Sequence, residues 1–479
     1  MTVARKIAYN TVFSTGARII AVALSLFSLG IIARYLGNEG FGDYSLILSF
    51  LYIFNILADL GLYSLLTREI SRPDADEKKI ASNIFTIRVV ALVVFLGLAV
   101  AVIWFFPYAP NVKLGIVIAS FGYLFLSAAQ VLMGIFQKYL RIDRAGIADV
   151  IGRIVQVGLV LIFIQLKMGL FAIIMALNIS CVVNFFVNWI FAKKYIPFGF
   201  AFDFPFWKKM IKEALPIAAS IVLTLIYFKF DTILLSFKFV NSSSANPIID
   251  VGIYNIAYKI LEGLIFFPAM IVGLIMPILS KYAFSDVGAY KRTFQKTFDA
   301  LSVFIVPVVI GLSALSLPIV VLVGGNDFAV SSPILKILSF AVGLIFWGNL
   351  LGSSIIALNK QKTGAYIYLA GMTFNIATNL IFIPKYSYFA AASTTVATEL
   401  LVTILMFWLV YRAIKYFPSF AVFFKALFAG LMMLAFLKIF HEWNLFALII
   451  GGAAVYFAFL YLIKGINKED LSLLVKNEP

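Results

Sequence analysis

Charged residues inside long apolar segments are the part of this sequence that could do chemistry. A cation at the centre of a bilayer costs about 2.5–3.5 kcal/mol even on a lenient insertion scale. The cations in such segments are Arg18, Arg34, Arg88, Arg153, Lys229 and Lys259, and the acids are Asp59, Asp149, Asp231, Glu262 and Glu399. We therefore expect most of these side chains to face water, an opposite charge or the membrane interface.

Local spacing predicts two ion pairs. Asp149 and Arg153 are four residues apart, and Lys259 and Glu262 are three apart, so each pair shares a helix face. We expect both pairs to neutralise themselves at least in part.

Other charged residues have no such neighbour. Arg18 and Arg88 have no acid three or four residues away, which makes them the best candidates for an open cationic site. Lys229 and Asp231 are two residues apart and are expected to point away from each other. Extension of the arginine side chains toward headgroups is the alternative to a cavity-facing role.

A cationic cavity suits an anionic substrate. The guanidinium fork of arginine donates paired, charge-assisted hydrogen bonds to phosphate oxygens. The predicted substrate-binding residues are Arg18, Arg88, Arg153, Lys229 and Lys259. Asp231 and Glu262 are candidates for binding a coupling H⁺ or Na⁺. The alternatives are a structural ion pair with Lys259 for Glu262, and backbone or water contacts for Asp231.

The elements that must position these residues are membrane-spanning helices. The sequence is 63% hydrophobic with a mean hydropathy of +1.03, well above the ~45–50% apolar content of soluble domains. About 20 apolar residues cross a bilayer as a helix. We predict an all-α polytopic membrane protein with about fourteen spans: 10–34, 41–66, 81–106, 112–136, 147–166, 169–192, 212–238, 251–279, 293–317, 333–358, 362–384, 388–411, 420–439 and 443–463.

The positions of the basic residues predict the orientation. Of the 38 Lys and Arg residues, 26 fall on the side of the N-terminus and six on the other side. Cytoplasmic loops carry such an excess, so both termini are expected in the cytoplasm. The net charge of +16 then reflects membrane topology, and nucleic acid is not an expected partner.

Two motifs carry a family resemblance. Residues 34–44 read R-x-L-G-x-x-x-F-G-x-Y and are followed by Asp59-Leu60-Gly61-Leu62; a second stretch has Phe230-Asp231 and then Val251-Gly-Ile-Tyr254. This pattern resembles the polysaccharide transporter family of lipid-linked oligosaccharide flippases, including the O-antigen type. That family lies within the multidrug/oligosaccharidyl-lipid/polysaccharide exporter superfamily. The resemblance implies alternating access in the inner (cytoplasmic) membrane. It also implies a polyprenyl-pyrophosphate-linked glycan as substrate, with membrane lipid and polysaccharide polymerase machinery as partners.

The chain is expected to divide near its middle. Residues 204–209 read as a short amphipathic helix lying in the interface. Phe41-Gly-Asp-Tyr44 and Val251-Gly-Ile-Tyr254 open spans six apart, which suggests a parallel repeat. The expected parts are a first lobe at 1–192, a linker at 193–211, a second lobe at 212–411 and two extra spans with a tail at 412–479.

No catalytic constellation is present. The sequence has one histidine, His441, and one cysteine, Cys181, so neither a transition-metal site nor a cofactor is expected. The alternatives to an oligosaccharide flippase are a lipid II flippase and a cation-coupled multidrug exporter of the same superfamily. A membrane glycosyltransferase or polymerase is rejected because the longest outer loop, around 239–250, is too short for one.

Overall fold

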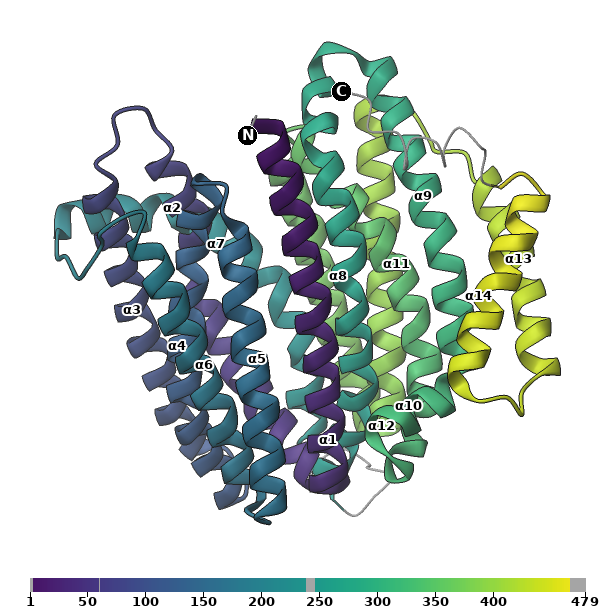
Figure 1. Cartoon of the computed structure of the whole chain (residues 1–479), viewed down its shortest axis with the longest axis horizontal. Coiled ribbons are helices and arrows are strands. Elements are labelled where there is room, and N and C mark those ends of the chain that lie inside the picture. Colours follow the sequence, from purple (N-terminus) through teal and green to yellow (C-terminus); the bar gives the residue numbers. More distant parts are fainter. Residues whose placement is uncertain (1–2, 60, 238–245, 466–479) are drawn as a thin grey trace. The chain divides into compact units, whose positions relative to one another are not determined.

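The structure, a computed structural model, describes residues 3–59, 61–237 and 246–465. Its regular elements in these ranges are all helical (Figure 1). A helix satisfies its own backbone donors and acceptors, which lipid cannot do. Most of the outer loop at 239–250 and nearly all of the tail after residue 464 lie outside the described residues.

The helices follow one another through the chain with short connections. They are α1 Val3–Asp59, α2 Leu62–Ile70, α3 Glu77–Val102, η1 Ile103–Phe105, α4 Pro110–Lys138, α5 Ile142–Gln165, α6 Gly169–Lys193, α7 Phe204–Leu235, α8 Pro247–Ser285, α9 Val287–Ala314, α10 Ser316–Gly324, η2 Asn326–Ser331, α11 Ser332–Ala357, α12 Gln361–Ile414, α13 Ala421–Ile439 and α14 Leu445–Leu462.

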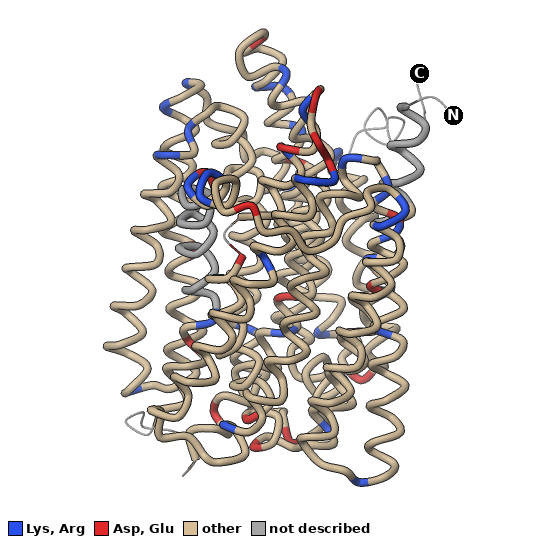
Figure 2. The backbone as a smooth tube through the Cα atoms, turned by 90° about the vertical axis from the view of Figure 1, so that its left-hand side faces the viewer, with Lys and Arg blue, Asp and Glu red and all other residues tan. Residues whose placement is uncertain are grey.

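Eleven helices within the described residues are long and apolar enough to cross a membrane. Two of them each contain two predicted spans, because α1 breaks at Gly37 (φ 65°, ψ −175°) and α12 breaks at Ser387 (φ 49°, ψ −130°). With α7 these segments correspond to the fourteen predicted spans, so the all-α polytopic fold is confirmed. Charged residues lie mostly near helix ends, and a few interrupt the apolar lengths (Figure 2).

The amphipathic stretch predicted at 204–209 is not a helix of its own, whereas its position in the membrane interface stays a prediction. α7 begins at Phe204 and continues without interruption to Leu235. The Asp203 side chain caps its start by accepting a hydrogen bond from the Phe206 amide at 3.1 Å, and Pro205 occupies the first turn, where its missing amide is harmless. The amphipathic stretch is therefore the first part of a longer helix.

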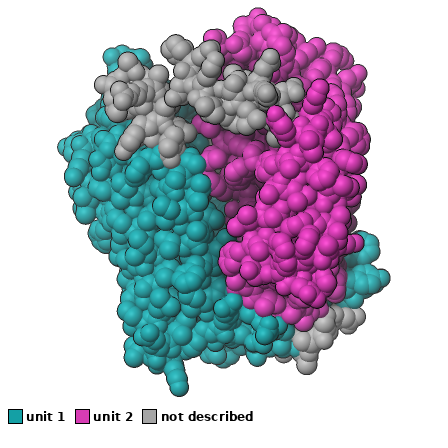
Figure 3. Space-filling view, turned by 45° about the vertical axis from the view of Figure 1, so that its right-hand side comes forward, with its two compact units in different colours: residues 1–255, 323–327, 379–387 teal, residues 256–322, 328–378, 388–479 magenta. Residues whose placement is uncertain are grey.

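The chain divides into two compact units, coloured separately in Figure 3. Unit 1 comprises residues 1–255, 323–327 and 379–387, and unit 2 comprises residues 256–322, 328–378 and 388–479. In unit 1, α1 packs against α3, α4 and α5, and α6 lies between α4 and α5. The boundary between the units falls within α8, at a different place from the predicted linker, and the pseudo-symmetric lobes remain a prediction.

Within unit 2, α13 and α14 pack against α9. Met433 and Leu437 of α13 and Leu460 of α14 belong to one buried cluster with Val303. The Tyr456 hydroxyl, buried in the same cluster, donates a 2.7 Å hydrogen bond to the Val303 carbonyl. The two last helices are thus fixed by apolar packing and one satisfied polar group.

Within unit 1, the two copies of the predicted Gly-x-Tyr repeat meet. A methyl group on Gly42 would lie 2.0 Å from the Ile248 carbonyl oxygen, and one on Gly252 would lie 2.2 Å from the Asn38 carbonyl oxygen. These distances are far below any real carbon–oxygen contact, so only glycine allows the second part of α1 and the start of α8 to approach so closely. The repeat glycines therefore set a tight helix crossing.

Candidate functional site

Arg88 is the predicted site residue whose surroundings differ most from the prediction. Its side chain is 0% exposed, and its Nη1 lies 2.6 Å from Asp59 Oδ1. The guanidinium also donates to the Ala58 carbonyl at 2.9 Å and to the Ser127 hydroxyl at 2.5 Å. The expectation that Arg88 forms an open, unneutralised cation is wrong, because its acid comes from another helix.

The environment of Arg88 explains why the chain keeps a charge there. α1 ends at Asp59, Gly61 adopts a left-handed conformation (φ 66°), and α2 starts at Leu62. Carbonyl groups at a helix end lack intrahelical partners, and Arg88 satisfies that of Ala58 while pairing with Asp59. Arg88 thus fastens α3 and α4 to the break between α1 and α2, as a structural residue.

Arg153 has the arrangement predicted from its spacing. Its Nε lies 3.8 Å from Asp149 Oδ1, which confirms the pair, and its Nη1 donates to Gln156 Oε1 at 3.0 Å. About a third of each charged side chain remains exposed. Arg153 is therefore held in place by its own helix, α5, and still offers part of its guanidinium to a ligand.

Arg18 and Lys229 differ in exposure. Arg18 lies on α1 with an exposed side chain. Lys229 of α7 is 5% exposed, with its ammonium 5.6 Å from the centre of the Tyr52 ring, a cation–π distance. Of the two, Arg18 is the side chain that a substrate could reach in this structure.

Asp231 is a buried carboxylate with donors from two other helices. It is 1% exposed and accepts hydrogen bonds from the Tyr254 hydroxyl of α8 at 2.9 Å and from Asn379 Nδ2 of α12 at 2.5 Å. Beside it, Thr232 and Asn255 hydrogen-bond each other at 3.2 Å. Buried carboxylates need such partners, or a bound proton or cation, to offset the loss of water.

A second buried carboxylate lies on α8, and sequence reasoning did not single it out. Asp250 is 0% exposed and accepts a 2.5 Å hydrogen bond from the Ser387 hydroxyl at the break in α12. The signal in the sequence that could have pointed to Asp250 is its position four residues before Tyr254 of the predicted motif.

Lys259 and Glu262 form the predicted pair in unit 2. Lys259 Nζ lies 2.6 Å from Glu262 Oε2, and both side chains are about a third exposed. The predicted ion pair is therefore confirmed, and Asp231 is the less exposed of the two residues predicted to bind a coupling ion.

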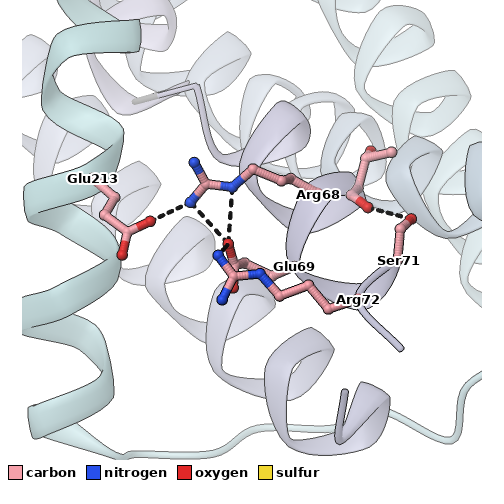
Figure 4. A network of polar contacts seen from close by, with 6 residues as sticks. Arg68, Glu69, Ser71, Arg72 and Glu213 are labelled. Atoms are coloured by element: carbon pink, nitrogen blue, oxygen red, sulfur yellow. Dashed lines mark hydrogen bonds and ion pairs between the residues drawn. The ribbon is translucent and has the colours of Figure 1, made fainter. Parts of the chain in front are cut away.

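A charged network joins α2 to α7 (Figure 4). The Glu69 carboxylate, 6% exposed, lies 2.8 Å from Arg68 Nη2 and 2.9 Å from Arg72 Nη2. Arg68 also pairs with Glu213 of α7. The buried Glu69 carboxylate thus holds two arginines, and Arg68 links α2 to α7.

Comparison with known proteins shows which family the chain belongs to. The sequence model of the family described as "Polysaccharide biosynthesis protein" matches residues 7–283, more than half of the chain. The chain belongs to this family. The match covers both motifs from which the resemblance was predicted.

A curated relative and two solved structures are similar to this member of the polysaccharide biosynthesis family. It is 26% identical over 305 residues to the capsular polysaccharide biosynthesis protein CapF of Staphylococcus aureus, covering 62% of this chain and 74% of CapF. The lipid II flippase MurJ, in an inward closed conformation, superposes with a TM-score of 0.77 at 18% identity, covering 94% of this chain and 98% of MurJ.

An inward-facing multidrug resistance MATE transporter of the MOP superfamily superposes with a TM-score of 0.66 at 16% identity, covering 85% of this chain and 98% of that chain. At these identities the likeness shows the fold alone. The fold is the one that MOP-superfamily transporters and flippases share, and these are not enzymes, in agreement with the prediction.

Proposed function

We propose that this protein is a flippase that moves polyprenyl-pyrophosphate-linked oligosaccharide units across the cytoplasmic membrane by alternating access. Family membership supports a role in polysaccharide biosynthesis, and the fold supports transport. The single observation that carries the proposal is the combination of that family with the fold of a lipid-linked glycan flippase. The apolar polyprenyl chain of such a substrate would stay in the lipid, whereas its pyrophosphate and glycan need a polar, cationic path.

Two arginines are proposed to hold the pyrophosphate. Arg18 is exposed, and Arg153 is partly exposed while held by Asp149 and Gln156. Arginine binds phosphate through paired, charge-assisted hydrogen bonds, so two such side chains suit a diphosphate. Arg88 is left out because its guanidinium is fully enclosed, and Lys229 and Lys259 remain secondary proposals.

The experiment is reconstitution of the purified protein into vesicles with a fluorescent polyprenyl-pyrophosphate glycan. Arg18→Ala and Arg153→Ala should each slow glycan translocation at least tenfold, the equivalent of about 1.4 kcal/mol for one lost charged hydrogen bond. Lys438→Ala, an exposed outer lysine, is the matched control and should leave the rate unchanged. Wild-type protein that moves no labelled glycan would sink the proposal.

Lipid II is the second candidate substrate. The support for this candidate is the shared fold with the lipid II flippase MurJ. Competition between unlabelled lipid II and the labelled oligosaccharide lipid separates the two candidates, because the true substrate inhibits at the lower concentration.

We also propose Asp231 as the coupling residue, binding H⁺ or Na⁺. Its burial and its contacts with Tyr254 and Asn379 support this role, because an ion held there is shielded from water. Asp231→Asn should abolish any dependence of translocation on a Na⁺ or pH gradient while the protein still binds glycan lipid. A mutant that responds to both gradients like wild type would exclude Asp231.

Placement in the inner membrane with both termini in the cytoplasm is part of this proposal. It is supported by the bias of basic residues. Association with polysaccharide polymerase machinery is proposed as well, since a flipped repeat unit must be handed to an enzyme that joins it. Crosslinking in cells that make the polysaccharide would test that association.

A further inference from the structure

The segment that joins α6 to α7 is fastened to α3 through alternate residues. The backbone amides of Gly199, Ala201 and Asp203 donate hydrogen bonds of 3.0–3.1 Å to Ser82, Thr86 and Asn83, respectively. We call residues 199–212 the linker strap. Polar side chains of α3 thus replace the partners that an extended chain would find in a sheet.

Two further contacts fix the end of this extended part. Asn83 Oδ1 also accepts a hydrogen bond from Trp207 Nε1 at 2.9 Å, and Lys79 Nζ lies 2.8 Å from Asp203 Oδ2. The Lys79 ammonium lowers the pKa of the Asp203 carboxyl, so Asp203 is ionised at neutral pH and can cap α7. The strap is therefore held by four side chains of α3: Lys79, Ser82, Asn83 and Thr86.

Three phenylalanines, which alternate with the hydrogen-bonded residues of the strap, are largely exposed. Phe200, Phe202 and Phe204 are 66%, 64% and 67% exposed, whereas Phe198, just before them, is buried against Phe85. Phe200 and Phe202 precede α7, and Phe204 is its first residue. Three large, exposed apolar side chains at alternate positions favour an apolar environment.

Lysines follow directly on the first turns of α7. Lys208, Lys209 and Lys212 are exposed, while Met210 and Ala214, four residues apart, are buried on the opposite face. The strap thus presents a row of phenylalanines next to a row of ammonium groups. Segments that lie on an anionic membrane surface commonly combine aromatic side chains with neighbouring lysines.

We propose that the linker strap is an in-plane membrane anchor, in which Phe200, Phe202 and Phe204 enter the headgroup boundary and the three lysines bind anionic phospholipid headgroups. The occupant is the lipid surface itself. Charge complementarity selects anionic headgroups, and the apolar row selects a bilayer over a soluble phosphate. The inference does not depend on the proposed substrate.

The test places a reporter on the strap of the full chain. Cys181 is buried and is the one cysteine of the sequence, so Cys181→Ser with Phe202→Cys gives a single labelling position for an environment-sensitive dye. In nanodiscs of phosphatidylcholine containing phosphatidylglycerol, the dye emission should lie at shorter wavelength than in phosphatidylcholine alone. Lys208→Gln with Lys209→Gln and Lys212→Gln should remove that difference.

Retention of phosphatidylglycerol by the detergent-solubilised protein gives an independent measurement. Each lysine beside an anionic surface is worth about fivefold in affinity, so the triple variant should retain far less lipid. Lys360→Gln with Lys362→Gln, two exposed lysines of unit 2, is the control and should change neither readout.

Three results would overturn the proposal. The first is emission typical of water in both lipid mixtures. The second is a short-wavelength emission that needs neither phosphatidylglycerol nor the lysines, which would make the strap an uncharged anchor. The third is a change that appears only with polyprenyl pyrophosphate, which would assign the lysines to the substrate.

Discussion

Arg88 is a charge that the fold has withdrawn from water. Its guanidinium is enclosed by the Asp59 carboxylate, the Ala58 carbonyl and the Ser127 side chain. A buried pair contributes little net stability, but loss of one partner leaves polar groups without hydrogen bonds. We therefore expect Arg88 to hold the α1–α2 break in place without contacting a substrate.

Replacement of Arg88 by Met should lower the free energy of unfolding by about 3–5 kcal/mol, because four hydrogen-bonded groups lose their donor. Thermal unfolding in detergent, followed by tryptophan fluorescence, measures the effect. Arg72→Met is the control, since Arg72 is half exposed and its pair with Glu69 should be worth below ~1 kcal/mol. Equal losses in the two variants would contradict the structural role.

At the scale of elements, the crossing of α1 and α8 depends on two glycines. Gly42 and Gly252 come from corresponding Gly-x-Tyr segments, and each leaves room for a carbonyl of the other element. Asn38 Nδ2 donates to the Asp327 carbonyl at 3.0 Å beside this crossing, in unit 1. Backbone contact of this kind leaves no flexible atom that could move aside.

Gly42→Ala should destabilise the protein by at least ~1–3 kcal/mol, because the new methyl group meets a backbone oxygen and the helices must separate. Gly158→Ala on α5 is the matched control. A methyl group there meets nothing within 4 Å, so the substitution should stabilise by about 0.4–1 kcal/mol. Scanning fluorimetry compares the two variants, and an unchanged melting temperature for Gly42→Ala would refute the tight crossing.

At the scale of the whole molecule, charge placement gives the proposed orientation. The excess of Lys and Arg alternates along the chain with the fourteen predicted spans, so one span too many or too few would reverse every later loop. The breaks at Gly37 and Ser387 matter here, because each divides one long helix into two crossings.

Reporter fusions test this topology. A green fluorescent protein after residue 465 should fluoresce, because it folds in the cytoplasm, whereas alkaline phosphatase fused there should be inactive. The reverse is expected for fusions within residues 323–327, at the turn that contains Gly325 (φ 89°). The same reporter active at both positions would contradict the odd number of spans, five, predicted between them.

The sequence by itself determined the membrane class, the number of spans and the pairs Asp149–Arg153 and Lys259–Glu262. The membrane class and the spans depend on composition. The two ion pairs depend on spacing along one helix, because residues three or four apart lie on the same helix face. Only the tertiary structure decided that Asp59 neutralises Arg88 and that Asn379, 148 residues away, binds Asp231. Such contacts depend on how helices rotate and cross, and spacing within one helix carries no information about its neighbour's register.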